Sequence, residues 1–405
     1  MSEATMIQSA FLASVQKLDQ AAADISLYTS AQQREIPTNI PFYVTVAALE
    51  LEPAMIAQLH QLGAVLSRYF ALVARLRGDD PRFAFFRPDI MITEQGLKVC
   101  EVETSPFGMA LTLFLQRNIV VPGVIGDVDR TIDCFLHHWE AWHGTRNGRF
   151  VYSDHSSNFV GQLRYLANVL RERGHEWRVE HVASIVHQRR KMPSYRCFYS
   201  FERASDLYVA RFCEFQPDII PTDVSLFEGK KMLALWRTPL IQNLLSPEDN
   251  ALLEAVLMPT WIVTPDVPQS FPSNIRSWMD LAELPKSQRR YVLKRAGGHP
   301  DASWARSVLF LHKRSTKEVE HALRMALLSP GDWVIQDFYG NIKYTLPYAE
   351  YDLQTVRTMK GRVRLTPYYD FLTGKLLVAK ATLRRDTLFI HGATDSINTV
   401  IAESS

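Results

Sequence analysis

Residues 85–108 read FFRPDIMITEQGLKVCEVETSPFG, a stretch in which charged residues interrupt two apolar runs. Apolar residues dominate 85–92 and 97–102, and the Thr93-Glu94-Gln95-Gly96 segment between them has the composition of a turn. The stretch therefore predicts a β-hairpin. Asp89 lies on its first strand, and Glu101 and Glu103 lie on its second, two positions apart and hence on one face.

Three carboxylates on one face of a hairpin repel one another unless a cation lies between them. Oxygen ligands of this kind suit Mg²⁺, which usually completes its shell with substrate phosphates. Arg87, beside them, can stabilise charge on a transferring phosphoryl group or an acyl oxyanion. The alternative is an exposed hairpin with solvated charges, and the hairpin sequence alone leaves both interpretations open.

Two later segments have compositions that suit a nucleotide. In YVLKRAGGHPDASWARSV (291–308), Lys294 ends a predicted strand and Gly297 and Gly298 follow it, so an ammonium and backbone N–H groups can face phosphate oxygens. The G-x-x-x-x-G-K-[ST] pattern is absent, and a Gly-Gly loop is also typical of a hairpin turn. WVIQDFYG (333–340) predicts an apolar strand with a polar, aromatic exit, which by itself indicates only a buried strand.

The remaining periodicities outline the other elements. An amphipathic helix is predicted over 53–76. Strand 150–152, helix 159–173 and strand 177–179 predict a parallel βαβ unit without a G-x-G-x-x-G loop. The other expected elements are helices over 229–245, 246–257 and 316–328 and strands over 308–310, 333–338 and 376–383.

Composition limits the class of protein. A chain of 405 residues with 47% hydrophobic and 22% charged residues predicts a globular protein of two or three structural units. A formal net charge of +2 does not favour binding to nucleic acid or to an anionic membrane, and no apolar run approaches the length of a bilayer span. The four cysteines form no C-x-x-C pair, which favours buried thiols in a reducing, cytoplasmic setting.

A second cluster of polar residues carries no prediction of chemistry. His137, His138 and His143 fall in a Trp-rich helical stretch that lacks H-E-x-x-H. We therefore expect a surface helix and no zinc site there.

Taken together, the hairpin, the lysine loop and the hinge strand resemble the ATP-grasp ligases. In D-alanine–D-alanine ligases the metal-binding hairpin R-x-D…E-x-N-T-x-P-G follows the lysine loop and the hinge, whereas here it precedes them by some two hundred residues. This order resembles the circularly permuted ATP-grasp group, which includes glutathionylspermidine synthase-like proteins. The resemblance implies an α+β/α/β fold: a permuted ATP-grasp fold with helices and the metal hairpin over 1–148, a pre-ATP-grasp α/β unit over 149–222, and a nucleotide-binding part over 223–405.

The resemblance also implies residue roles. Asp89, Glu101 and Glu103 would hold Mg²⁺, and Arg87 and Arg384 would contact the acyl-phosphate or a substrate carboxylate. ATP would contact Lys231 (with Lys230 competing), Lys294, Gly297, Gly298, Ser303 and Gln336, and the main chain of Asp337 and Phe338 would read adenine. Asp395 is a looser substrate candidate. Two departures are Glu103, where the family has Asn, and Ala305, where a glycine is expected.

The activity that the resemblance implies is ATP-dependent carboxylate–amine ligation through an acyl-phosphate. The cofactors would be ATP and Mg²⁺, and the partners small-molecule or peptide carboxylates and amines, with no nucleic acid or membrane and with a homodimer left open. Glu103 and Ala305 favour the alternative of a non-catalytic, ATP-grasp-like nucleotide-binding protein, and an ATP-dependent kinase is a third hypothesis.

Overall fold

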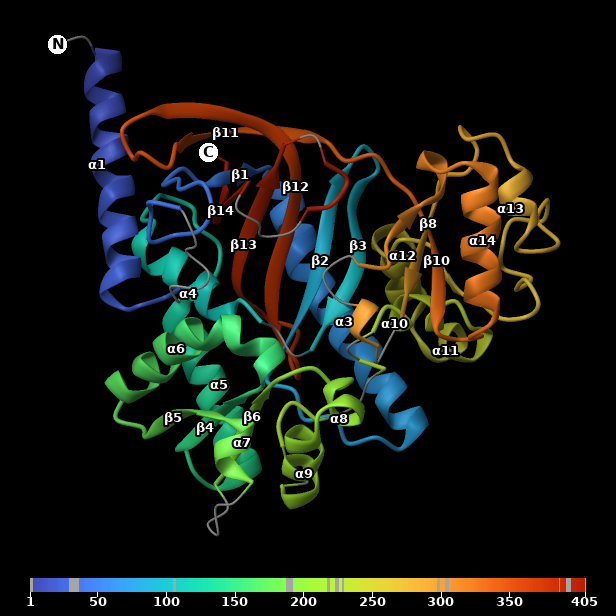
Figure 1. Cartoon of the computed structure of the whole chain (residues 1–405), viewed down its shortest axis with the longest axis horizontal. Coiled ribbons are helices and arrows are strands. Elements are labelled where there is room, and N and C mark those ends of the chain that lie inside the picture. The colour runs from blue at the N-terminus through green and yellow to red at the C-terminus, as the bar shows by residue number, and fades with distance from the viewer. Residues whose placement is uncertain are drawn as a thin grey trace.

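The structure is a computed structural model. It describes residues 3–28, 36–104, 107–186, 192–216, 219–222, 226–227, 229–296, 299–302, 306–385, 387–390 and 395–404. Strands within these ranges form three sheets, joined by helices into a mixed α+β fold (Figure 1).

The largest sheet has seven strands in the order β1-β14-β13-β12-β2-β3, with β11 also paired to β12. The predicted hairpin is confirmed as β2 (Phe85–Thr93) and β3 (Gly96–Glu103), which form one end of this sheet. Its other strands are β1 (Leu49–Leu51), β11 (Lys343–Ala349), β12 (Val356–Asp370), β13 (Leu376–Arg384) and β14 (Ser396–Glu403). The predicted strand over 376–383 corresponds to β13, whereas no strand was predicted for β11, β12 or β14.

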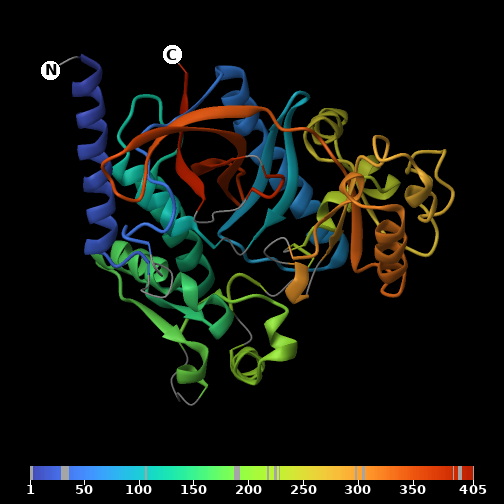
Figure 2. The same ribbon diagram turned by 45° about the horizontal axis from the view of Figure 1, so that its top comes forward.

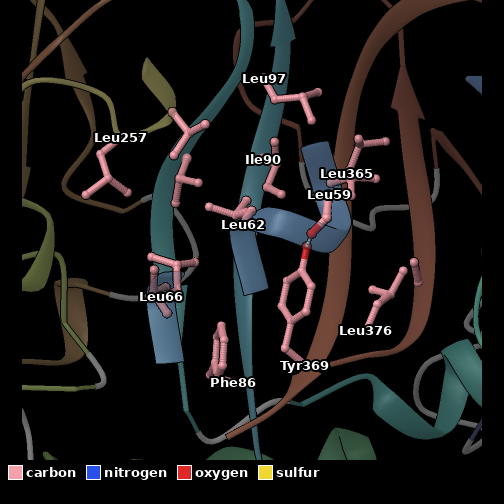
Figure 3. Packing of buried hydrophobic residues seen from close by; sticks show 14 of the residues in the cluster. Leu59, Leu62, Leu66, Phe86, Ile90, Leu97, Leu257, Leu365, Tyr369 and Leu376 are labelled. Carbon is pink, nitrogen blue, oxygen red and sulfur yellow. Dashed lines mark hydrogen bonds between the residues drawn. The ribbon is translucent and has the colours of Figure 1, made fainter. Parts of the chain in front are cut away.

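Helix α3 (Pro53–Arg77) covers one face of the seven-stranded sheet, as the predicted apolar stripe requires. Proline at its start and Gly78 in a left-handed conformation at its end mark the boundaries. Leu59, Leu62 and Leu66 of this helix pack on sheet residues such as Ile90 (Figure 3). The Tyr369 hydroxyl donates a hydrogen bond of 2.8 Å to the Leu59 carbonyl, which ties β12 to the helix.

A second hydrophobic core lies on the face of the seven-stranded sheet opposite α3. It joins this sheet to several helices and to a smaller sheet. It is formed by α1 (Glu3–Asp24), α4 (Met109–Asn118), α5 (Val128–His143) and α6 (Val160–Glu172). The smaller sheet is parallel, in the order β5 (Trp177–His181), β4 (Gly148–Tyr152), β6 (Ser194–Cys197). The predicted βαβ unit is therefore confirmed as β4-α6-β5. Short helices α7 (Val182–Ile185), α8 (Glu202–Ser205) and α9 (Leu207–Phe215) follow.

The third sheet is antiparallel and lies on the β3 side of the seven-stranded sheet (Figure 2). Its order is β7 (Thr260–Ile262), β10 (Trp333–Asp337), β8 (Tyr291–Arg295), β9 (Leu309–Phe310). Helices α13 (Asp280–Glu283) and α14 (Thr316–Leu327) pack against it, and α12 (Pro247–Val256) leads into β7. The helix expected over 229–245 is wrong: α10 (Met232–Leu235) and α11 (Pro239–Leu244) are separate, because Pro239 cannot continue a helix and instead begins a new one.

None of the helices formed by the described residues is long and apolar enough to cross a membrane.

Candidate functional site

The face of the seven-stranded sheet opposite α3 carries a continuous polar stripe. Along β2, Phe86 and Ile90 face α3, so Arg87 and Asp89 face the other way. The same alternation turns polar side chains to this face on the neighbouring strands. They are Glu101 and Glu103 on β3, Arg364 and Thr366 on β12, Lys380 and Thr382 on β13, and Asn398 on β14.

A β-bulge allows β3 to join this stripe. Asp89 pairs with Glu101 but Ile90 pairs with Val99, so Cys100 is an extra residue on β3. Without the bulge, Val99 and Glu101 would share a face. With it, Val99 packs in the α3 core while Glu101 lies opposite Asp89. The bulge also leaves the Cys100 carbonyl to accept hydrogen bonds from outside the sheet.

Two arginines form ion pairs with the carboxylates of Asp89 and Glu103 at the centre of the stripe. Arg87 lies 2.6 Å from a Glu103 oxygen and 3.3 Å from Asp89 Oδ1, and its Nη1 donates to the Phe107 carbonyl at 2.9 Å. Arg364 of β12 donates to Asp89 Oδ2 at 2.8 Å. Asp89 is buried, yet its Oδ1 has no hydrogen-bond partner, so this oxygen can still accept a ligand.

Burial and the neighbouring charges together shift the pKa values of Asp89 and Glu103 in opposite directions. Burial would raise the pKa of Asp89, but Arg364 and Arg87 hold it below its usual value. Burial raises the pKa of Glu103 to about 7, because Arg87 only partly offsets desolvation and the repulsion from Asp89 and Glu101. Glu103 thus exchanges a proton near neutral pH, whereas Asp89 stays ionised.

Lys230 rather than Lys231 reaches the carboxylates. Its buried ammonium lies 2.6 Å from Glu101 Oε1 and donates to the Ala302 carbonyl at 2.8 Å. Lys231 points elsewhere, with its ammonium 4.0 Å from Asp332. Of the two lysines that the sequence left in competition, the structure therefore brings Lys230 into the site, and it connects β3 to the segment beside the lysine loop.

Lys294 and Gln336 connect the four-stranded sheet to the hairpin. The Lys294 ammonium donates to Gln336 Oε1 at 2.5 Å and to the Cys100 carbonyl at 3.5 Å. Gln336 Nε2 donates to the same carbonyl at 3.3 Å and to the Thr260 hydroxyl at 2.9 Å. Burial lowers the pKa of Lys294. Segments about two hundred residues apart thus meet at the bulge, as expected if the hairpin and the lysine loop serve one site.

The far side of the stripe carries a further buried lysine, Lys380 of β13. Lys380 donates to Asn398 Oδ1 at 3.0 Å and to the Thr382 hydroxyl at 3.1 Å. Burial, with Arg364 and Arg87 nearby, holds the pKa of Lys380 well below its usual range. A lysine that is costly to ionise in the free protein regains its charge when an anion binds beside it.

The charges of the stripe favour a polyanion. Within the described ranges, three carboxylates share the site with the basic residues Arg87, Arg364, Lys230 and Lys294, and Lys380 can add a further positive charge when an anion binds beside it. The oxygens of Asp89, Glu101 and Glu103 are hard ligands of the type that Mg²⁺ prefers. In the described part of the chain, however, they do not form a group whose ligand atoms all lie within 4.8 Å of one another, and each carboxylate is paired with an arginine or a lysine. The residue types suit a magnesium-bound phosphate chain, but the three carboxylates do not converge on one point in this structure.

Four other predicted residues, Arg384, Asp395, Asp337 and Phe338, make contacts outside this cluster. Arg384 pairs with Asp395 at 2.9 Å and donates to the Phe389 carbonyl. Two of the main-chain groups predicted to read adenine are already used: the Asp337 amide donates to the Pro259 carbonyl and the Phe338 amide to the Arg290 carbonyl. Neither amide is free for adenine in this structure, and recognition of adenine by the main-chain carbonyls of these residues stays a prediction.

Some predicted residues lie outside the described residues: Gly297, Gly298, Ser303 and Ala305. Sequence reasoning missed Arg364, Thr260 and Asn398. The alternation of Arg364 and Thr366 with apolar neighbours was a signal for a strand with one polar face, but nothing local links them to residues 89 or 380.

The fold has a known counterpart. It is similar to a glutathione synthetase-like effector from Globodera pallida, solved in its apo form, with a TM-score of 0.55 and 12% identity over 97% of each chain. A candidate gamma-glutamylcysteine synthetase from Methylobacillus flagellatus KT has a TM-score of 0.40 and 10% identity over 85% of this chain and 84% of that one. No family description and no curated protein sequence matches the chain. At this identity, the likeness to the effector shows a shared fold.

Proposed function

We propose that the chain is an ATP-dependent carboxylate–amine ligase with a circularly permuted ATP-grasp fold. The observation that carries the proposal is the meeting of Lys294 and Gln336 with the bulged strand that bears Glu101 and Glu103. Fold similarity to a glutathione synthetase-like effector supports the same class. The substrates would be a small or peptide carboxylate and an amine.

In this proposal the protein positions reactants and compensates charge. Lys294 and Lys230 contact the phosphate chain of ATP, and Arg87 stabilises negative charge on the phosphoryl group as it passes to the substrate carboxylate. Asp89, Glu101 and Glu103 would hold Mg²⁺, which when bound would neutralise phosphate charge. Transfer of the terminal phosphoryl group to the carboxylate gives the acyl-phosphate and ADP. The amine then attacks the acyl carbon, inorganic phosphate leaves, and loss of a proton from nitrogen gives the amide.

One observation favours the non-catalytic alternative, a protein that binds nucleotide without turnover. Asp89 is paired with Arg364 and Arg87, Glu101 with Lys230, and Glu103 with Arg87. The carboxylates are therefore compensated by side chains, and their mutual repulsion does not by itself require a metal. No comparable observation favours the kinase.

The deciding experiment measures ADP formation across a screen of carboxylates and amines, for the wild type and for Glu101→Gln and Glu103→Asn. A ligase sustains ADP and phosphate release over many turnovers only when both substrates are present, whereas a kinase needs the carboxylate alone. We expect Glu101→Gln to abolish turnover, because the substitution removes the carboxylate that would bind the metal while the side chain keeps nearly the same shape. We expect Glu103→Asn to retain substantial activity, because asparagine is the residue that the family has at this position.

The matched control is Glu94→Gln, which changes an exposed carboxylate in the turn of the same hairpin. Its turnover should equal that of the wild type. ADP formation that Glu101→Gln leaves unaffected would overturn the metal-site assignment. Nucleotide binding without ADP formation under any substrate pair would support the non-catalytic protein.

A further inference from the structure

A cluster of three potential metal ligands lies at the C-terminal end of β12, away from the hairpin bulge. Cys134 and His138 are one helical turn apart on α5, and Asp370 is the last residue of β12. Within the described residues this is the one group of three cysteine, histidine or acidic side chains whose ligand atoms converge in this way. The expectation of a surface position is wrong for His138, which is 4% exposed, although His137 beside it is exposed.

The geometry of the cluster suits a tetrahedral metal. The ligand atoms of the three residues all lie within 4.8 Å of one another, and His138 Nε2 is 2.8 Å from Asp370 Oδ1. Ligands at zinc distances lie about 3.3–3.8 Å apart, so shifts of about 1 Å would close the site. Helical spacing of four residues places Cys134 and His138 on the same face, as a shared ion requires.

The surroundings of the cluster already orient two of its members. The Leu372 amide donates to Asp370 Oδ1 at 3.0 Å, and the Thr373 hydroxyl bonds to Asp370 Oδ2. The Trp142 ring stacks on the His138 imidazole with ring centroids 5.3 Å apart. Such outer contacts hold metal ligands in position. Cys134 is only partly buried, so part of this residue is exposed to solvent.

We propose that Cys134, His138 and Asp370 form a zinc site, with water as the fourth ligand. One sulfur, one imidazole nitrogen and one carboxylate oxygen make a donor set that zinc accepts and that Mg²⁺, which prefers oxygen alone, does not. The bound ion would join α5 to the turn between β12 and β13 (Leu376–Arg384), and so brace the sheet that carries the polar stripe. The proposal does not depend on the ligase assignment.

The test uses the full chain, stripped of metal with a chelator and then titrated with Zn²⁺ against a chromophoric competitor. We expect one zinc ion per chain and a higher melting temperature with zinc, since an ion that binds the folded state stabilises it. Co²⁺ serves as a spectroscopic probe, because a thiolate ligand gives a sulfur-to-metal charge-transfer band.

Three variants separate a metal site from a purely structural cluster. Cys134→Ser, which nearly conserves shape, should weaken zinc binding by about a hundredfold or more and abolish the charge-transfer band. His138→Gln should also weaken binding, although it can lower stability by disturbing the bond to Asp370. His137→Gln, on the exposed side of the same helix, should bind zinc as the wild type does.

Two outcomes would overturn the proposal. One is a wild-type chain that takes up no zinc at micromolar concentration. The other is a Cys134→Ser variant that keeps wild-type affinity, which would place any bound zinc elsewhere. In both cases the cluster would be only a hydrogen-bonded anchor for the β12–β13 turn.

Discussion

At the scale of single residues, Lys294 is the most informative position. Its buried ammonium donates hydrogen bonds to Gln336 and to the Cys100 carbonyl. Lys294 therefore lies where the four-stranded sheet meets the seven-stranded sheet. Replacement by methionine keeps the apolar stem and removes the charge. We expect Lys294→Met to weaken ATP binding by about 1–3 kcal/mol, the range for a lost charge-assisted hydrogen bond. Calorimetric titration measures the change.

Lys286→Met is the control for Lys294, because it removes an exposed ammonium from the loop before β8. Its ATP affinity should match that of the wild type. Equal affinity in Lys294→Met and the wild type would show that Lys294 does not contact the nucleotide.

Glu103 should make the affinity for magnesium–ATP fall at acidic pH, which gives the plot of affinity against pH an acidic limb. Its pKa is raised to about 7, so it is protonated below pH 7 and ionised above it. Mg²⁺ binds the ionised form, so the affinity for magnesium–ATP should fall by up to about tenfold for each pH unit below 7. Glu103→Asn has no proton to displace and should lack this limb.

The measurement is the ratio of the affinities of the wild type and Glu103→Asn for magnesium–ATP between pH 5.5 and pH 8, since the phosphate of ATP titrates in the same range in both. A ratio that stays constant with pH would contradict the assignment of Glu103 as a ligand.

At the scale of elements, the contact between α3 and the β12–β13 turn leaves no room for a side chain. A Cβ atom on Gly63 would lie 2.1 Å from the Gly374 carbonyl oxygen and 2.3 Å from Tyr369 Cδ1. Alanine is the better helix former by about 1 kcal/mol, but the clash with backbone is larger. We expect Gly63→Ala to lower the free energy of unfolding by at least about 2 kcal/mol, measured by urea denaturation.

Gly340→Ala is the matched control, because a Cβ atom there meets nothing within 4 Å. Its free energy of unfolding should stay within about 0.5 kcal/mol of the wild type. If Gly63→Ala were equally neutral, α3 could not pack on the turn as closely as the structure places it.

At the scale of the whole molecule, a nucleotide that contacts both sheets should stabilise the folded chain. At a concentration of ATP about one hundred times its dissociation constant, binding contributes about 2.7 kcal/mol. For a chain of this length that corresponds to a rise of about 3 °C in melting temperature. Differential scanning fluorimetry with magnesium alone and with magnesium–ATP measures it.

Lys294→Met should lose most of this rise at the same ATP concentration. A rise of equal size in that variant would place the nucleotide away from the junction between the sheets.

Local patterns of residue type are sufficient to predict several elements. The apolar stripe predicts α3, alternation and turn composition predict the β2–β3 hairpin, and a strand–helix–strand pattern predicts β4-α6-β5. The carboxylates of the hairpin and Lys294 could be named for the same reason, since their residue types and spacing lie within short segments. The order of these segments also suggested which would meet.

The way in which those segments combine depends on contacts between residues that are far apart in the sequence. Arg364 reaches Asp89 across 275 positions of sequence, and Lys230 rather than its neighbour turns toward Glu101. The bulge at Cys100 reverses which side chains of β3 face the site, and burial brings His138 against Asp370. The physical reason is that strand pairing, bulges and desolvation depend on partners distant in sequence, and no local pattern of residue types specifies those partners.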